Sequence, residues 1–561
     1  MKKLLTVFLL VSVVVLSGCG SSSAPVNLPP LQEYPPWEWS DVSTVYVIDV
    51  TSEEFDVFLF AQAIQGIAAR EKPQVYLNYT ERPSYTLWLE DMQKKHGFEI
   101  VAVSDIWSLY DIFKDYITGY IAYPAYGTQA MNYATTLAGV LDAVPITPRF
   151  RAEANSRGLQ QLENAANYRN INQIISNYGS RLNKTRFLNQ DYNNPNLRDY
   201  GIKHRTITVS LDPVQGGLQP VYDFLEPNAV MFGWGPGDEV RTVQVHSLHH
   251  VISIPTDHAL NMSFYEEEFS TDTFTQQQEL IDKDLRAQPG KHYVSFSYSD
   301  GDNIQWLINY FALDTTRWAH PERNVPLGWP LAPALPRYSP IILEYLYRTA
   351  RPTDNVFSAG CGYGYIFPSL YDMDKLVEFG ELTAEVMQRS DMHYLEILDE
   401  FFDGETKPEV FEAYLRNPQI KGIMYRAGHF YIEGKGFVKW VNDKPVVSYR
   451  DALWNLSYYD VTTERQRNRD IYRLAYRISQ YPKDHTKIDG YTMVFVHAWS
   501  HLYEGIQKTA DWLRENDPDV VIVTPATLMR LVEENVPRVD AAPVRTFFDT
   551  DWDYSSVAHL Y

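Results

Sequence analysis

The chain has 561 residues, of which 45% are apolar and 21% charged, a composition typical of a folded protein with a substantial core. Its formal net charge of −22 argues against a nucleic-acid partner and against attachment to anionic lipid through basic residues, because both surfaces are negatively charged. With only two cysteines, a framework of several disulfides is excluded. At roughly 150 residues per domain, the length predicts more than one structural unit.

The amino terminus has the features of a lipoprotein signal peptide. Lys2 and Lys3 precede an apolar run that is too short to cross a bilayer core of ~30 Å as a mature helix. The run ends in Leu16-Ser-Gly-Cys19, which looks like a lipobox, so we expect residues 1–19 to direct export and the Cys19 thiol to carry lipid. An ordinary secretory signal with an incidental cysteine is the alternative.

A tether is expected next, because residues 20–43 are rich in serine and proline and favour a flexible, extended segment. We therefore predict an exported protein that is lipid-anchored to a membrane of the cell envelope. The outer membrane, the periplasm and the cell surface all remain open as its location.

Strand and helix patterns alternate along residues 44–285. The first strand pattern begins at Val45, and a helix pattern over 55–70 and a second strand pattern over 74–78 follow it. This β–α–β order predicts a parallel sheet with a right-handed crossover. The polar stretch 155–183 is interpreted as helical. Because the alternation continues, we expect one or more small α/β units here, as two or three subdomains.

A second α/β region is predicted over residues 286–540, with 541–561 as a tail. Its first strand pattern, 293–298, runs directly into an acidic turn, and further strand patterns alternate with helix patterns behind it. Such alternation is typical of a (β/α) barrel or a distorted relative, whose catalytic residues lie at the carboxyl ends of the strands. The predicted fold class is therefore α/β, with amino-terminal α/β units followed by a barrel-like carboxyl-terminal domain.

The acidic turn after that strand is the main catalytic candidate. Asp300 and Asp302 flank Gly301, which permits an unusual backbone turn. Two crowded carboxyl groups should differ in pKa, as acid/base catalysis requires, and the pair could instead bind a divalent cation through its oxygens. The alternative is a structural turn in which Asp302 or Asn303 caps the next helix. Asn303 and Trp306 are candidate substrate-binding residues.

Further polar residues follow later strand patterns. Glu396 and Asp399 lie at the end of one strand and would add carboxyl groups at the same rim. His497 ends another strand, where it could serve as an acid, a base or a ligand; a core or surface histidine is the alternative. Arg426 and His429 follow a third strand and could bind an anionic or hydroxyl-rich ligand.

A loop rich in glycine and tyrosine follows the strand pattern at 355–358. Its three glycines let the backbone approach a ligand, and Tyr363 and Tyr365 could stack on sugar rings. A tight structural turn is the alternative. Cys361 has no evident catalytic partners and is interpreted as structural.

Several stretches together resemble the GxGYxYP family of exported bacterial proteins, to which a glycoside hydrolase activity is ascribed. The similar amino-terminal segments are 65–76, 132–143, 232–239 and 261–263. The most specific likeness is Ser299-Asp-Gly-Asp-Asn-Ile-Gln-Trp306. The motif that names the family is found here only in a shifted form, Gly360-Cys-Gly-Tyr-Gly-Tyr-Ile-Phe-Pro368.

The resemblance implies a carbohydrate-active hydrolase. We expect a glycoside hydrolase that acts on poly- or oligosaccharide at the cell envelope, with Asp300 and Asp302 as its carboxyl pair. A further acid would come from Asp399 or Glu396, and His497 would assist. This reaction requires no cofactor, although a divalent metal at Asp300, Asp302 and His497 is compatible with the residues. A metal-dependent carbohydrate deacetylase and a non-catalytic glycan-binding surface lipoprotein are the alternatives.

Overall fold

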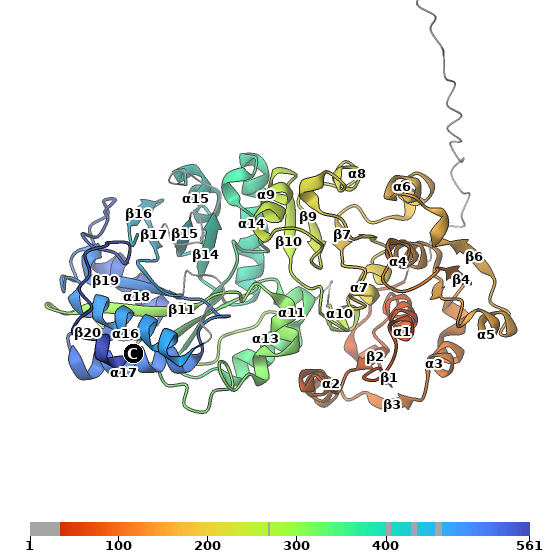
Figure 1. The fold of residues 1–561 in the computed structure, drawn as a ribbon, viewed down its shortest axis with the longest axis horizontal. Coiled ribbons are helices and arrows are strands. Elements are labelled where there is room, and N and C mark those ends of the chain that lie inside the picture. Colours follow the sequence, from red (N-terminus) through yellow and green to blue (C-terminus); the bar gives the residue numbers. More distant parts are fainter. Residues whose placement is uncertain (1–33, 268–269, 400–405, 428–434, 455–462) are drawn as a thin grey trace, which may run out of the picture.

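The computed structural model describes residues 34–267, 270–399, 406–427, 435–454 and 463–561. The secondary structure is mixed α and β, as predicted, and is arranged in two lobes that lie side by side along the long axis of the molecule (Figure 1). The amino-terminal lobe runs from red to yellow and the carboxyl-terminal lobe from green to blue. Within the described residues, no helix combines the length and the apolar character that crossing a bilayer would need.

The first unit of the amino-terminal lobe is a three-stranded parallel sheet with strand order β2-β1-β3. Helix α1 is buried from Asp56 to Ala68, because it is apolar on nearly all sides and packs between this sheet and the other units. Its two buried glutamines both donate hydrogen bonds to neighbouring units: Gln62 to the Pro195 carbonyl at 2.8 Å and Gln65 to Asn261 Oδ1 at 2.7 Å. The elements of this unit are β1 (Thr44–Asp49), α1 (Phe55–Ala68), β2 (Val75–Asn78), α2 (Pro83–His96), β3 (Glu99–Val103) and α3 (Ile106–Phe113).

Two more parallel sheets complete this lobe, with strand orders β5-β4-β6 and β10-β9-β7-β8. The elements of the second unit are β4 (Tyr120–Ala122), α4 (Gln129–Leu141), β5 (Val144–Ile146), α5 (Arg151–Ser156), β6 (Gln161–Asn164) and α6 (Ile171–Tyr178). Those of the third are β7 (Arg186–Asn189), α7 (Arg198–Lys203), β8 (Ile207–Val209), α8 (Gln219–Tyr222), β9 (Ala229–Phe232), α9 (Glu239–Leu248), β10 (Val251–Ile254) and α10 (Met262–Tyr265). The prediction of helix over 155–183 was wrong in part, because this stretch includes the strand β6, which pairs with β4.

The carboxyl-terminal lobe is built on one large sheet, with the strand order β16-β17-β15-β14-β13-β12-β11-β19-β18, and β20 also pairs with β11. Every pair in it is parallel except β16 with β17. Its strands are β11 (His292–Tyr298), β12 (Leu327–Leu331), β13 (Asp354–Ser358), β14 (Tyr394–Asp399), β15 (Gly422–Ala427), β16 (Val438–Val441), β17 (Lys444–Ser448), β18 (Asp451–Leu453), β19 (Tyr491–Val496) and β20 (Val520–Ile522).

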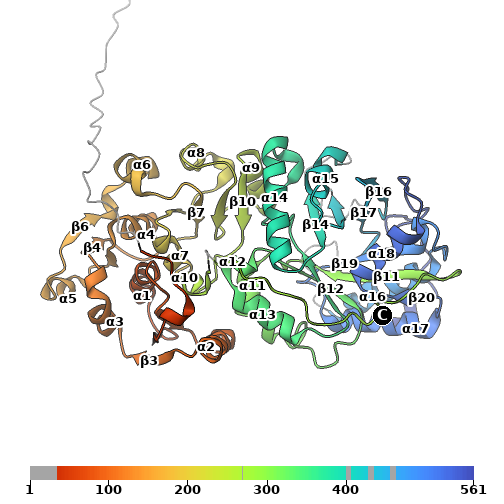
Figure 2. The same cartoon turned by 180° about the vertical axis from the view of Figure 1, so that it is seen from behind.

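Helices cover this sheet on the outside, as both views show (Figures 1 and 2). They are α11 (Ile304–Asn309), α12 (Leu335–Tyr338), α13 (Pro340–Thr349), α14 (Met373–Arg389), α15 (Pro408–Leu415), α16 (Glu464–Gln480), α17 (Tyr503–Asn516) and α18 (Pro525–Asn535). The longer ones are amphipathic and bury their apolar face, for example Leu376, Phe379 and Met387 of α14.

The predicted barrel is not confirmed, because the described strands form no closed barrel. The segment 444–453 forms two successive strands. Its first part, β17, pairs with β15, and its second part, β18, pairs with β19. At the corner between them, the Tyr449 amide donates to the Tyr425 carbonyl (3.2 Å) and the Arg450 amide to the Met493 carbonyl (3.0 Å). The two flanks of the sheet therefore approach each other at this corner without forming a continuous ring of strands.

The two lobes are joined by backbone pairing. Tyr365, in the loop after β13, forms an antiparallel bridge with Ser253 of β10, with hydrogen bonds of 2.8 and 3.1 Å. The Phe367 amide donates to Ser247 Oγ of α9 at 2.8 Å. On the first unit, Trp88 Nε1 donates to the Ile308 carbonyl at 2.8 Å. The glycine- and tyrosine-rich loop is thus a connection between the lobes.

The last part of the predicted tether lies against the amino-terminal lobe. Trp39 stacks on His96, with ring centroids 4.5 Å apart, and contacts Phe264 at 5.5 Å. Its Nε1 donates to Glu267 at 2.7 Å. Residues 34–43 are therefore part of the folded body, because the tryptophan ring gives this segment an apolar anchor. Cys19 and residues 20–33 lie outside the described residues.

Candidate active site

Parallel pairing brings the main candidates to one edge of the large sheet. Asp300 and Asp302 follow β11, His497 follows the neighbouring strand β19, and Glu396 and Arg426 lie on the paired strands β14 and β15. All four strands are parallel, so their carboxyl ends meet at the same edge. The groups are close enough to affect one another, since the charge of Asp300 contributes to the pKa shifts of the other four.

The turn that carries the two aspartates is shaped by close contact with β12. Asp300 adopts a left-handed backbone conformation, with φ of 66°, which aspartate tolerates better than most residues. A Cβ on Gly301 would lie 1.5 Å from the Pro330 carbonyl oxygen, so no larger residue fits between the two backbones. Glycine at this position therefore allows both aspartates to sit against the sheet edge.

Asp302 is confined from the opposite side by Gly360, which begins the loop after β13. Gly360 has φ of 51°, and a Cβ there would lie 2.6 Å from Cβ of Asp302. Burial of the carboxyl group, and next the nearby charge of Asp300, raise the pKa of Asp302 to about 7. Glu239 and Glu396 add to the same shift. Asp302 is therefore a carboxylic acid that keeps its proton close to neutral pH.

Asp300 has a different environment, because two side chains donate hydrogen bonds to it. Trp499 Nε1 donates to Oδ1 at 2.8 Å, and the Ser299 hydroxyl donates to Oδ2. The neighbours Asp300 and Asp302 thus differ in their surroundings, as acid/base catalysis requires.

Glu396 forms a buried ion pair with Arg426. The carboxyl group lies 3.0 Å from the Arg426 guanidinium and accepts a hydrogen bond of 2.9 Å from the Tyr449 hydroxyl. The guanidinium also lies 4.0 Å from the centre of the Phe495 ring. Burial raises the pKa of Glu396, although the charge of Arg426 opposes the shift. A paired acid of this kind is better suited to orient groups and set the local field than to exchange protons.

His497 is held by an aromatic ring and a hydroxyl. It stacks on Trp454, with centroids 4.6 Å apart, and its Nδ1 lies 2.8 Å from Ser500 Oγ. Burial lowers the pKa of His497, and the charge of Asp300 opposes this only partly. The imidazole is therefore neutral near pH 7 and can accept a proton.

The aromatic side chain that is exposed at the site is not one of those predicted to stack on a sugar. Tyr363 and Tyr365 are 2% and 4% exposed and hydrogen-bond to Tyr338 and Glu239, so their burial between the lobes contradicts stacking on a sugar. Trp306, 5% exposed, packs on Phe311. Trp499, in contrast, is 53% exposed, and its ring lies 5.0 Å from Trp306. The sequence analysis missed Trp499, although it lies two residues after His497.

Two further candidates, Asp399 and Asn303, are placed differently from the prediction. Asp399 is fully buried and accepts hydrogen bonds from the Ser369 and Thr406 hydroxyls, so it stabilises the sheet edge and faces no solvent. Asn303 caps α11, with its side chain accepting from the Trp306 amide at 3.2 Å, which was the structural alternative. His429 lies outside the described residues.

Glu239, at the start of α9, was missed as a member of the site. It comes from the amino-terminal lobe, accepts a hydrogen bond of 3.3 Å from the Tyr365 hydroxyl and acts on the pKa of Asp302. Only tertiary contact between the lobes brings it here. In the part of the chain that the structure describes, no group of three or more His, Cys, Asp or Glu side chains is gathered as a metal site.

Comparison with known proteins assigns a family. A search of curated proteins gave no match. Among solved structures, the chain is similar to the crystal structure of a putative hydrolase from Bacteroides thetaiotaomicron VPI-5482, with 26% identity and a TM-score of 0.77 over 88% of this chain and 95% of that chain. Three family models match: "GxGYxYP_N 1st domain" at 44–115, "GxGYxYP third domain" at 183–266 and "GxGYxYP putative glycoside hydrolase C-terminal domain" at 290–533. Since these models account for most of the chain, from the first sheet to the end of the large one, the protein belongs to the GxGYxYP family.

Proposed function

We propose that the protein is a glycoside hydrolase in which Asp302 is the general acid. The supporting observation is the pKa of about 7 that burial and neighbouring carboxyl groups give to Asp302. A glycosidase needs one carboxyl group that holds a proton near neutrality and a second that is ionised. We assign the role of the second carboxyl group to Asp300, which accepts hydrogen bonds from Trp499 and Ser299.

The reaction then follows from the positions of these groups. Asp302 gives its proton to the glycosidic oxygen as the bond to the anomeric carbon breaks, and the Asp300 carboxylate stabilises the positive charge that develops on the sugar ring. Water supplies the hydroxyl of the new reducing end and returns a proton to one of the two carboxyl groups. Glu396 and Arg426, paired at 3.0 Å, keep the local field constant during this exchange.

Replacement of the acid tests the assignment directly. We expect Asp302→Asn to lower kcat by roughly 10²- to 10⁴-fold, because the amide cannot donate the catalytic proton. The assay is release of reducing ends from polysaccharide fragments. Asp511→Asn, at an exposed site on α17, is the matched control and should leave the rate unchanged. Full activity of Asp302→Asn would contradict the proposal and leave glycan binding as the function.

The pH profile gives an independent test. Because the pKa of Asp302 is about 7, its proton is present below that pH and is lost above it. We expect kcat/KM to fall about tenfold per pH unit above pH 7. The same raised pKa makes the ionised carboxyl destabilising to the fold, so Asp302→Asn should increase the unfolding free energy at pH 8. A rate that stays constant to pH 9 would exclude Asp302 as the acid.

Trp499 is proposed as the ring that stacks on the sugar next to Asp300. Trp499→Ala should raise KM roughly two- to tenfold through the lost ring contact. Trp499→Phe keeps a ring but loses the hydrogen bond from Nε1 to Asp300, so it should lower kcat more than it raises KM. Leu502→Ala, at a nearby exposed position, controls for disturbance of the loop. Unchanged steady-state constants for Trp499→Ala would remove this residue from the site.

A second candidate is a metal-dependent carbohydrate deacetylase, and the electrostatic interaction of Asp300 with His497 favours it. The two reactions release different products. Acetate release that a chelator abolishes would support the deacetylase, whereas reducing ends released with or without chelator would support the glycoside hydrolase.

We further propose that the protein acts at the cell envelope, held there by lipid on Cys19. The lipobox-like sequence and the Lys2-Lys3 pair that precedes the apolar run support this. Cys19→Ala should move the protein from the membrane fraction to the soluble fraction of lysed cells, because one or more acyl chains provide the attachment. Metabolic labelling with a palmitate analogue would follow the lipid itself. Membrane association of Cys19→Ala equal to wild type would refute lipidation at this cysteine.

A further inference from the structure

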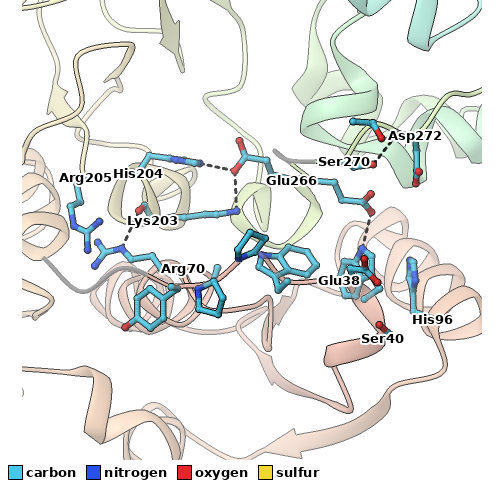
Figure 3. Close-up of a pocket in the computed structure, with 18 residues that line it drawn as sticks. Glu38, Ser40, Arg70, His96, Lys203, His204, Arg205, Glu266, Ser270 and Asp272 are labelled. Carbon is cyan, nitrogen blue, oxygen red and sulfur yellow. Dashed lines mark hydrogen bonds and ion pairs between the residues drawn. The ribbon is translucent and has the colours of Figure 1, made fainter.

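A large cavity lies in the amino-terminal lobe and is lined by none of the candidate active-site residues. Its volume is about 1090 Å³. It runs between the segment 34–40, on one side, and residues 203–205, 266–267 and 270–272, on the other, as Figure 3 shows. Arg70 and His96 of the first unit line it as well. The two sides differ in chemistry.

The side formed by segment 34–40 is aromatic. Trp37 and Trp39 meet edge to face, with centroids 5.4 Å apart, and Trp39 stacks on His96 at 4.5 Å. Tyr34, Pro35 and Pro36 also line the cavity, and Tyr34 is close enough to Arg70 and Arg205 for their charges to act on its pKa. Trp37 and Tyr34 are only partly buried, so their rings can contact a ligand in the cavity.

The opposite side carries charged groups, most of which pair with each other. Glu266 is fully buried and lies 2.9 Å from Lys203, 2.6 Å from His204 and 3.3 Å from Arg186. Figure 3 shows Lys203 and His204 both turned toward the Glu266 carboxyl group. Lys203 and Arg186 are therefore balanced by Glu266 within the protein, and burial lowers the pKa of His204 to about 4, so that its imidazole is neutral near pH 7.

The positive charge of Arg205, at one end of the cavity, is neutralised less completely by nearby carboxylates. Among the described residues Arg205 forms an ion pair with Asp142 alone, at 3.8 Å, and the same Asp142 oxygen accepts a hydrogen bond from Arg70. Within the described part of the chain, the Nε and Nη2 groups of Arg205 have no hydrogen-bond partner, although both are buried. Burial and the neighbouring charge of Arg70 lower the pKa of Arg205 to about 10, which indicates a cation that its surroundings do not fully compensate.

We propose that this cavity is a binding site for an acidic saccharide, with a sugar carboxylate on Arg205 and a sugar ring against Tyr34 and Trp37. A guanidinium offers two parallel donors that match a planar carboxylate, and aromatic faces match the flat side of a sugar ring. A cationic end is also unusual in a chain whose net charge is −22. The site is separate from the carboxyl edge of the large sheet, and it does not depend on the proposed catalysis.

The test measures binding of trigalacturonate and of neutral galactotriose to the mature chain, by calorimetry and by tryptophan fluorescence. We expect trigalacturonate to bind and Arg205→Gln to weaken it about tenfold or more, because a hydrogen-bonded charge pair is lost. Trp37→Ala should weaken it as well through the lost ring contact. Galactotriose, which has the rings but no carboxylate, should bind more weakly than trigalacturonate. Arg205→Gln should leave its affinity unchanged, whereas Trp37→Ala should lower it.

Matched controls separate this site from others. Arg149→Gln removes a partly exposed cation elsewhere in the same lobe and should leave binding unchanged. Asp302→Asn should also bind normally, so a failure of the catalytic proposal leaves this one standing. Circular dichroism verifies that each variant is folded. Equal affinity for both saccharides, unchanged binding by Arg205→Gln, or inorganic phosphate bound more tightly than trigalacturonate would overturn the proposal.

Discussion

The candidate site depends on one steric constraint: the backbone must approach Asp302 from two sides. Gly301 lies against the Pro330 carbonyl and Gly360 lies against the Asp302 side chain, and neither position has space for a Cβ. Gly360 therefore brings the backbone against the Asp302 side chain, and burial of the carboxyl group is the first cause of its raised pKa. The second cause, the charge of Asp300, follows from the same turn, since a single glycine separates the two aspartates.

The amino-terminal lobe takes part in this arrangement instead of serving only as a scaffold. The bridge between Tyr365 and Ser253 fixes the loop that begins with Gly360, and Glu239 of α9 acts on Asp302 from the same lobe. A shift between the lobes would change both the enclosure of Asp302 and the field around it. The tyrosines of the family's naming motif thus have a structural reason to be present, although they do not meet a substrate.

The two sites also differ in charge. The carboxyl edge of the large sheet gathers acids around Arg426, whereas the cavity of the amino-terminal lobe ends in Arg70 and Arg205 with one carboxylate, Asp142, shared between them. An acidic polymer would meet repulsion over most of this chain, and we propose that the end of the cavity at Arg70 and Arg205 offsets it. Binding there would hold such a polymer on the protein without involving the carboxyl pair.

The sequence by itself determined the alternation of strands and helices, the parallel pairing, and the position of Asp300 and Asp302 after a buried strand, because these follow from local periodicity and chain direction. It did not reveal β12, because Gly328 and Pro330 are typical strand breakers. At Gly328 a Cβ would lie 2.6 Å from Pro525 and 2.8 Å from Phe357, so tertiary packing requires the glycine there. The sequence also assigned Tyr363 and Tyr365 to the substrate and overlooked Trp499 and Glu239. Packing between residues far apart in the chain decides whether an aromatic ring faces solvent or the other lobe. The local sequence pattern does not predict such packing.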